Sequence, residues 1–385
     1  MRTSSALRIS SEFRSPGRSV FLRRTALNGL SARSGLSVGL ALVFAIFYLA
    51  PAQAQVELDS EKDAEEGSKD EIVEFEVIAE GLNNPCGVAI QPETGTVFVA
   101  DSGNQRVVRV EGGNLVEVIT DFPKDVYGKG PKVNIGPLGL AFLSKSTLLV
   151  GGGGLPDGEE LLRVFELSDD TSPITAGQME ASFSLSATES RPGEGNFYAL
   201  AATPNGVYVT CNGDDEKGWV SRVSIEEGKP SAFGRYLATK EATGVNAPVG
   251  ATISPDGYLV VGQMGAIDTP GDSLLTFYDE GSKSVLLNLE TGLDDICAVA
   301  YSTGRIQRMY VLDYAWSDPG QGGLFKIVED PASESGMRAE RVVSLDKPTS
   351  MAFGLGGELF ITVRGATEEG DSSGQLLRIP SEAGL

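Results

Sequence analysis

Side chains that carry an amide or carboxylate oxygen precede each of six short apolar segments in this 385-residue chain. They are Asn83-Asn84, Asn134, Glu194 with Asn196, Asn246, Asp294-Asp295 and Asp346. Converging oxygens suit a hard cation such as calcium, which takes roughly six to eight oxygen ligands. We therefore predict Ca2+ or another divalent cation as a cofactor, held by Asn84, Glu194, Asn196, Asn246 and Asp295. The alternative is that these residues only shape turns, which Asn and Asp favour in any loop.

The chain contains no histidine, which restricts the chemistry it could perform. A Ser-His-Asp triad, an imidazole general base, haem attachment and most zinc sites are excluded. Catalysis would have to use carboxylates, a metal-bound water, or a Lys, Tyr or Cys, and Asp295 and Glu194 are the candidate bases. The run Gly151–Gly154 does not predict a phosphate loop, because no Lys-Ser/Thr pair follows it. We expect neither haem nor a nucleotide.

Five long, dissimilar and polar loops form a second candidate site. They span 151–160, 211–218, 262–273, 313–322 and 364–374, the last with the acids Glu368, Glu369 and Asp371. Variable loops on a regular scaffold are where binding usually occurs. The candidate ligand-binding residues are Asn212, Asp214, Tyr314, Trp316 and Arg364. Tyr314 and Trp316 either stack on a flat ligand such as a sugar or pack their own loop down.

The elements that position these residues follow from a repeat that occurs six times between Glu71 and Pro380. Each copy has a short strand opened by Pro or a substitute, a turn, a second apolar strand that ends in a polar loop, and a third strand. The six openings are Pro85, Pro137, Phe197, Pro248, Ile296 and Pro348, and they are 48 to 60 residues apart. That spacing is close to one four-stranded propeller blade, about 40–50 residues. We predict an all-β fold, a six-bladed β-propeller.

The last copy lacks an outermost strand, because the chain ends just after its third strand. The segment Ile72–Ile78 alternates apolar and polar residues ahead of the first copy and can supply the missing strand. This closure would leave no long unpaired edge. In such a ring, the loops before first strands and after second strands share one face, so both candidate sites would lie on it.

The repeat resembles those of the NHL-repeat, gluconolactonase-like and strictosidine-synthase-like propellers. The resemblance is carried by Pro85-x-Gly87-x-Ala89 and by Val99-Ala100-Asp101-x-x-Asn104-x-Arg106-Val107. In gluconolactonases, acids and amides on the channel rim hold one divalent ion, and the resemblance assigns such roles to Asn196, Asn246 and Asp295. The chain departs from that family at Asn83-Asn84-Pro85, where the family has a Glu. Quinone-dependent propeller dehydrogenases rely on a histidine, so no quinone is expected.

The first 54 residues are not part of the repeat. Seven Arg precede an apolar run from Gly35 to Ala50, and Ala52-Gln53-Ala54 follows. This pattern predicts a signal peptide cleaved before Gln55, with Arg23-Arg24 as a possible twin-arginine signal. An uncleaved membrane anchor is the alternative, but the run is shorter than the roughly 20 residues that a span needs. We predict an exported protein, periplasmic or extracellular, with a signal peptide at 1–54, a disordered acidic spacer at 55–70 and the propeller at 71–385.

The formal net charge of −22 disfavours nucleic acid and anionic lipid as partners. Cys86, Cys211 and Cys297 are far apart in sequence and are expected to be buried free thiols. We predict a monomer that binds a small molecule or an exported protein through its loop-rich face. The alternative is a metal-dependent lactonase or esterase. A condensing enzyme similar to strictosidine synthase is a third reading.

Overall fold

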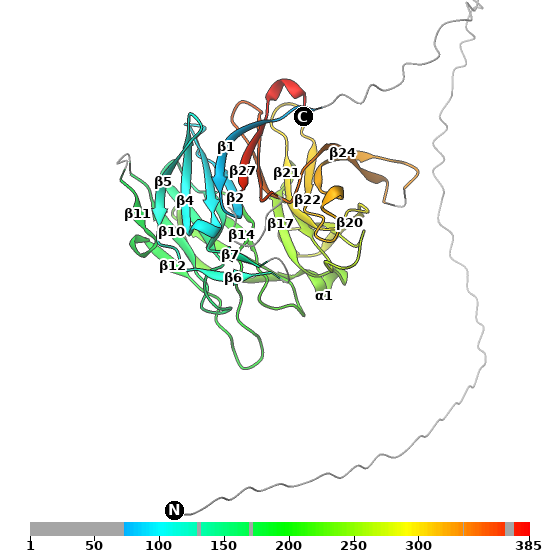
Figure 1. Ribbon diagram of the computed structural model, residues 1–385. Helices are drawn as coiled ribbons and strands as arrows, with labels where there is room; N and C mark the ends of the chain where they lie inside the picture. The colour runs from blue at the N-terminus through cyan, green and yellow to red at the C-terminus, as the bar shows by residue number, and fades with distance from the viewer. Residues whose placement is uncertain (1–72, 129–131, 169–171, 334, 366–372) are drawn as a thin grey trace, which may run out of the picture. The chain divides into compact units, whose positions relative to one another are not determined.

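The computed structural model describes residues 73–128, 132–168, 172–333, 335–365 and 373–385. It confirms the six-bladed β-propeller, with one antiparallel sheet per blade (Figure 1). The proposed signal peptide and acidic spacer lie outside the described residues. No helix in the described ranges has the length and apolar character needed to cross a membrane.

The blades follow the chain in order, each with its first strand innermost. Blade 1 contains β2 (Pro85–Ile90), β3 (Val97–Asp101), β4 (Arg106–Glu111) and β5 (Asn114–Thr120). Blade 2 contains β8 (Pro137–Phe142), β9 (Thr147–Gly152), β10 (Leu162–Glu166) and β12 (Ala181–Phe183). Blade 3 contains β13 (Leu200–Thr203), β14 (Gly206–Thr210), β15 (Trp219–Glu226) and β16 (Lys229–Ala238).

The other three blades repeat this arrangement. Blade 4 contains β17 (Pro248–Ile253), β18 (Leu259–Gln263), β19 (Leu274–Tyr278) and β20 (Val285–Glu290). Blade 5 contains β21 (Ile296–Tyr301), β22 (Met309–Asp313), β23 (Gly323–Glu329) and β24 (Met337–Ser344). Blade 6 contains β25 (Pro348–Phe353), β26 (Leu359–Val363) and β27 (Gly374–Ile379), completed by β1 (Glu76–Leu82).

The N-terminal strand closes the ring, as the sequence predicts. β1 pairs antiparallel with β27, with Val77 opposite Leu377 and Leu82 opposite Gly374. The strand begins at Glu76 rather than at Ile72, which lies outside the described residues. At the same seam, Thr349 Oγ1 donates to the Pro85 carbonyl at 2.6 Å, which ties the inner strands of blades 6 and 1.

Glycines near the start of the inner strands let neighbouring blades approach closely. A Cβ added at Gly87 would lie 2.2 Å from the carbonyl oxygen of Leu138, and one added at Gly139 would lie 2.2 Å from that of Tyr198. Real Cβ atoms do not come this near to backbone. The glycine of the Pro-x-Gly motif is therefore required by blade-to-blade contact at the hub.

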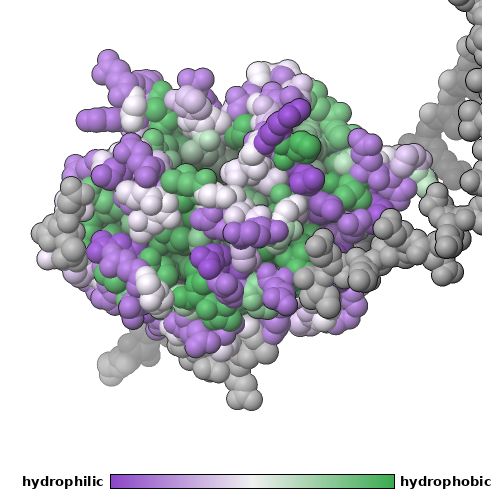
Figure 2. Space-filling view, turned by 90° about the horizontal axis from the view of Figure 1, so that it is seen from above, coloured by the Kyte–Doolittle hydropathy of each residue, from purple (hydrophilic) through white to green (hydrophobic). Residues whose placement is uncertain are grey.

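Apolar side chains fill the wedges between blades. Phe98 and Leu148 illustrate this, since they come from blades 1 and 2 and belong to one buried cluster. The turns between first and second strands lie on the face opposite the loop-rich one and carry the exposed Ile306 and Leu355. Figure 2 looks onto that opposite face, where hydrophilic side chains are interspersed with apolar ones.

Three insertions interrupt the repeat. A hairpin of β6 (Asp125–Tyr127) and β7 (Val133–Ile135) joins blades 1 and 2. β11 (Ile174–Thr175) leaves blade 2 and pairs in parallel with β5, which covers the outer edge of blade 1. A short helix, α1 (Thr239–Thr243), precedes blade 4.

Candidate functional site

One backbone contact recurs in all six blades and builds the loop-rich face, here called the mouth face. A residue one or two positions beyond each second strand donates its N–H to a carbonyl of the loop that enters the first strand, as Tyr314 does to Asp295 at 3.0 Å and Arg364 does to Lys347 at 3.0 Å. The residues brought to these equivalent positions are Gly103, Gly153, Asn212, Met264, Tyr314 and Arg364. The two loop sets that the sequence places on one face are thus hydrogen-bonded to each other.

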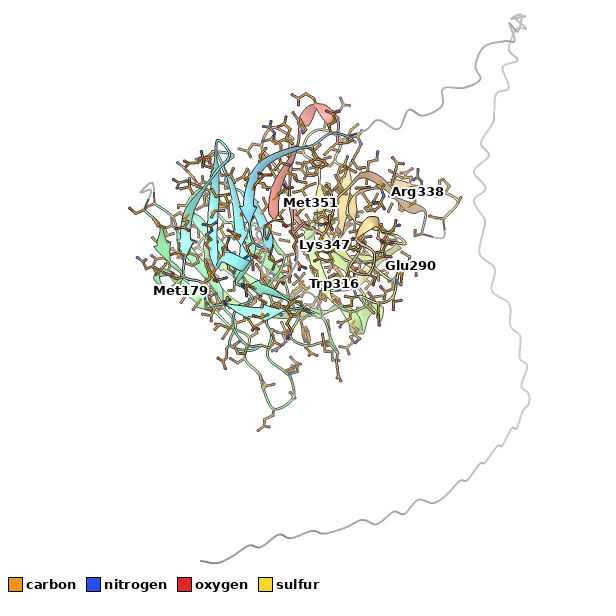
Figure 3. All side chains as sticks on the ribbon, viewed as in Figure 1. Met179, Glu290, Trp316, Arg338, Lys347 and Met351 are labelled. Atoms are coloured by element: carbon orange, nitrogen blue, oxygen red, sulfur yellow. The ribbon has the colours of Figure 1, made fainter. Side chains whose placement is uncertain are left out.

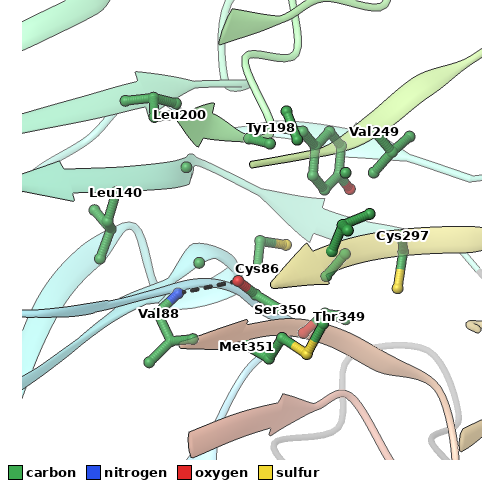
Figure 4. A pocket seen from close by; sticks show the side chains of 17 residues that line it. Cys86, Val88, Leu140, Tyr198, Leu200, Val249, Cys297, Thr349, Ser350 and Met351 are labelled. Atoms are coloured by element: carbon green, nitrogen blue, oxygen red, sulfur yellow. Dashed lines mark hydrogen bonds between the residues drawn. The ribbon is translucent and has the colours of Figure 1, made fainter. Parts of the chain in front are cut away.

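A central channel opens beside these loops. It encloses a cavity of about 90 Å³, lined by residues that lie at the inner edge of every blade. Cys86, Tyr198, Val249, Cys297 and Thr349 each stand at the second position of the repeat and surround the same space (Figure 4). In Figure 3, Lys347 and Trp316 lie below Met351, toward the mouth face. The cavity has room for a few water molecules or a small polar group.

The channel side chains are neutral at physiological pH. Cys86, Cys211 and Cys297 are buried free thiols, as predicted. Burial raises the pKa of the Cys86 thiol to about 12 and raises those of Cys297 and Tyr198 well above their ordinary values. A protonated thiol is a poor nucleophile, so these groups shape and polarise the channel rather than attack a substrate.

Asn84 and Asn196 adopt a left-handed backbone with φ of 45° and 49°. Ala247 and Lys347 have the same conformation at the equivalent place in blades 4 and 6, with φ of 54° and 51°. The fold therefore demands this geometry, and Asn tolerates it better than most residues. The side chain of Asn84 also donates to the Asn134 carbonyl at 3.1 Å. These observations support the turn interpretation for Asn84 and Asn196.

Glu194 is fully buried and forms an ion pair with Arg235 at 2.8 Å through Oε1. Its second oxygen, Oε2, has no hydrogen-bond partner. Burial raises the pKa of the Glu194 carboxyl despite the opposing effect of Arg235. Because Arg235 already supplies a counter-charge, Glu194 is poorly suited to hold a second cation.

Asp295 differs from Glu194 because no cation neutralises it among the described residues. Its Oδ2 accepts the Trp316 N–H at 2.5 Å, while Oδ1 is buried without a partner. Its own N–H donates to Asp313 Oδ1 at 2.7 Å, so a second buried carboxylate lies nearby. Burial raises the pKa of Asp295 to about 6, and the neighbouring Asp313 adds to this effect. A carboxyl of this kind has the properties of a general acid or base near neutral pH.

The predicted metal site is represented only in part. Asn246 Oδ1 and Asp295 Oδ1 are buried oxygens that lack a partner and would accept a cation. Within the described ranges, however, no three Asp, Glu or Cys side chains lie close enough together to hold a metal ion. A divalent cation at the mouth therefore stays a prediction, and it rests on two oxygens, the Asn246 amide oxygen and one carboxylate oxygen of Asp295.

The predicted ligand-binding residues Asp214, Tyr314 and Trp316 already contact other side chains of the protein. The Asp214 carboxylate accepts from the Trp219 indole at 3.1 Å and from the Glu216 N–H, so it fixes its own loop. Tyr314 and Trp316 stack on each other at 5.3 Å between ring centroids and 29° between ring planes. Burial raises the pKa of Tyr314 to about 12, and its hydroxyl accepts a hydrogen bond from Arg364 at 2.8 Å.

Unpartnered polar atoms gather on the mouth face. Nine buried side-chain polar atoms of the described residues have no hydrogen-bond partner, and seven of them belong to mouth-face loops. The seven are Glu194 Oε2, Asn246 Oδ1, Asp272 Oδ1, Asp295 Oδ1, Ser373 Oγ, and Arg364 Nε and Nη2. Sequence reasoning missed Asp272 and Ser373, and it missed Tyr198 in the channel. The recurring second position of the first strands could have indicated Tyr198.

Comparisons with known proteins identify the fold but no family to which the chain belongs. No family model matches the chain, and no curated protein is similar to it in sequence. Among solved structures, a putative glucose dehydrogenase from Thermus thermophilus has a TM-score of 0.55 at 18% identity, covering 79% of this chain and 99% of that one. The soluble aldose sugar dehydrogenase of Escherichia coli has a TM-score of 0.56 at 13% identity, covering 80% of this chain and 99% of that one.

A third similar structure is a putative gluconolactonase, with a TM-score of 0.50 at 14% identity, covering 79% of this chain and 91% of that one. These likenesses match the propeller resemblance that the repeat indicated. At identities this low they establish a shared fold, and the same fold hosts many functions.

Proposed function

We propose that this protein is an exported binding module that takes a small polar molecule at the mouth of its central channel. The observation that carries the proposal is the gathering of seven unpartnered buried polar atoms on the mouth face. Buried polar groups are nearly always hydrogen-bonded, and leaving one unpaired costs about 1–3 kcal/mol. A ligand rich in hydroxyl groups, which both donate and accept hydrogen bonds, would satisfy several of them at once. The solved structures named for sugar dehydrogenases and a gluconolactonase make sugars and lactones the first ligands to test.

The test is isothermal titration of the purified protein with neutral sugars and lactones, beginning with glucose and glucono-δ-lactone. Asn246→Ala removes one unpartnered mouth oxygen and should weaken binding about fivefold to tenfold, the value of one hydrogen bond. Asn205→Ala is the matched control, because Asn205 is exposed in the β13–β14 turn on the opposite face. Equal losses for the two variants would refute a ligand site at the mouth, and no binding by any of these compounds would refute neutral sugars and lactones as its ligands.

A second candidate is a divalent-metal-dependent lactonase, and the buried Asp295 carboxyl favours it. An acid whose pKa lies near 6 and whose Oδ1 is free could accept a proton from water or bind a cation. Calcium should then stabilise the wild type, and lactone hydrolysis should disappear in Asp295→Asn. Heat released on calcium addition without any turnover would leave a metal-binding module and exclude the hydrolase.

A further inference from the structure

Arg364 carries a buried positive charge for which the described residues offer no counter-ion. The residue directly follows β26 and is 3% exposed. Its Nη1 donates to the Tyr314 hydroxyl at 2.8 Å, whereas Nε and Nη2 have no partner. A guanidinium remains charged at physiological pH, so burial cannot be relieved by losing a proton. An unpaired buried charge is strongly unfavourable, and this one requires an explanation.

Among the described residues, the other buried arginine, Arg163, and the partly buried Arg235 are both paired. Arg163 is also 3% exposed and has Glu160 at 3.6 Å, and Arg235 has Glu194 at 2.8 Å. The ion pairs of the described residues include none with Arg364, although the chain contains 53 acidic residues. Acidic side chains are abundant, so the missing partner sets Arg364 apart from its counterparts in blades 2 and 3.

The free edge of Arg364 is held in a fixed orientation. Tyr314 accepts from the opposite side of the guanidinium, and Tyr314 is itself fixed by its stack on Trp316 and by its N–H bond to Asp295. Nε and Nη2 point their N–H bonds nearly parallel along one edge, a spacing that matches the two oxygens of a planar carboxylate. Arg364 also lies near Cys86, whose thiol lines the channel.

We propose that Arg364 binds the carboxylate of a small organic acid through Nε and Nη2 at the mouth of the channel. The inference rests on the proposed ligand site and names the chemical class of its ligand. The cavity of about 90 Å³ is lined by Cys86 but not by Arg364, so the carboxylate would lie beside that cavity rather than inside it.

Isothermal titration with matched acids and amides tests the proposal. Acetate, lactate and benzoate are compared with acetamide, lactamide and benzamide, and inorganic phosphate is included as a tetrahedral anion. At least one acid should bind at least tenfold more tightly than its amide. Arg364→Gln should abolish this binding, Arg364→Lys should weaken it at least tenfold because the two-pronged geometry is lost, and Arg338→Gln on the exposed strand β24 should leave it unchanged. Binding of no acid, or tighter binding of phosphate than of every acid, would overturn the proposal.

Two further measurements separate this proposal from its alternatives. If Arg364→Gln still binds neutral sugars or lactones while no acid binds the wild type, the mouth site stands and the carboxylate assignment fails. The second measurement is thermal unfolding of the variants without ligand. Arg163→Gln leaves Glu160 buried and unpaired and should lower Tm by several degrees, whereas Arg364→Gln removes an unpaired charge and should leave Tm unchanged or higher. A comparable fall for both variants would show that Arg364 already has a partner within the chain, against the proposal.

Discussion

The buried carboxyl of Asp295 leads to a quantitative prediction about stability and pH. Asp295 is 1% exposed and receives one hydrogen bond, from the Trp316 N–H. Burial raises its pKa from the ordinary 3.8 to about 6, with the bond from Trp316 opposing that effect and Asp313 adding to it. The change that isolates this charge is Asp295→Asn, because an amide oxygen can still accept from Trp316.

The sign of the change in stability with pH follows from the protons that the folded and unfolded states release. Between pH 3.8 and 6 the unfolded chain loses the Asp295 proton while the folded protein keeps it, so the free energy of unfolding of the wild type falls as pH rises. Below this window the group is protonated in both states, and above it the full cost of the buried charge is present. Two pKa units at about 1.4 kcal/mol each give about 3 kcal/mol.

Urea unfolding of the wild type and Asp295→Asn at pH 4, 5, 6 and 7.5 measures this quantity. The stability of the variant relative to the wild type should increase by about 2.4 kcal/mol between pH 4 and pH 7.5, because part of the effect is already present at pH 4, and most of the rise should lie below pH 6.5. Any loss of stability caused by the new amide itself is nearly independent of pH, so it does not affect how the difference in free energy of unfolding changes with pH. The control is Asp256→Asn, in the exposed turn between β17 and β18. A difference that stays flat with pH would refute a buried, ionised Asp295.

Three other predictions concern the hub. Gly87→Ala forces a Cβ to within 2.2 Å of the Leu138 carbonyl and should lower the free energy of unfolding by about 3 kcal/mol or more, whereas Gly234→Ala, with no atom within 4 Å, should change urea stability by at most about 0.5 kcal/mol. Thr349→Val removes the seam bond to the Pro85 carbonyl and should cost about 1 kcal/mol in the same assay. Cys86 should react with Ellman's reagent at pH 8 only after unfolding, since burial raises its pKa to about 12; rapid reaction of the native protein would contradict this.

The sequence predicts the blades well because their strands obey a local rule. Apolar residues recur along the strands of every blade, and the predicted openings Pro85, Pro137 and Pro248 are the first residues of β2, β8 and β17. The hairpin β6–β7 and the strand β11 escape prediction because they interrupt the repeat and pair only through tertiary contacts. The glycine at position 87 is recognisable from sequence, but its reason, the Leu138 carbonyl of the next blade, is not.

The candidate site is less accessible from sequence, because a side chain's role depends on its partner. Asn84 and Asn196 were predicted as metal ligands, yet Ala247 and Lys347 share their left-handed backbone. Likewise, the sequence alone does not show which of Arg163 and Arg364 forms an ion pair. One has a glutamate three residues before it and is paired, while the other emerges beside a tyrosine with one edge free.

The strongly negative charge of the chain makes the isolation of Arg364 more informative. A long-range acidic field stabilises a cation anywhere on the protein, but it is screened beyond about 8 Å at physiological salt, so it cannot replace a contact. The same field opposes the approach of anions in general, which means that an anion bound at the mouth must be retained by local geometry. The side chain that can supply such geometry is one whose free donors are buried, fixed and parallel. Arg364 meets all three conditions, whereas the acids around the mouth meet none of them for an anionic ligand.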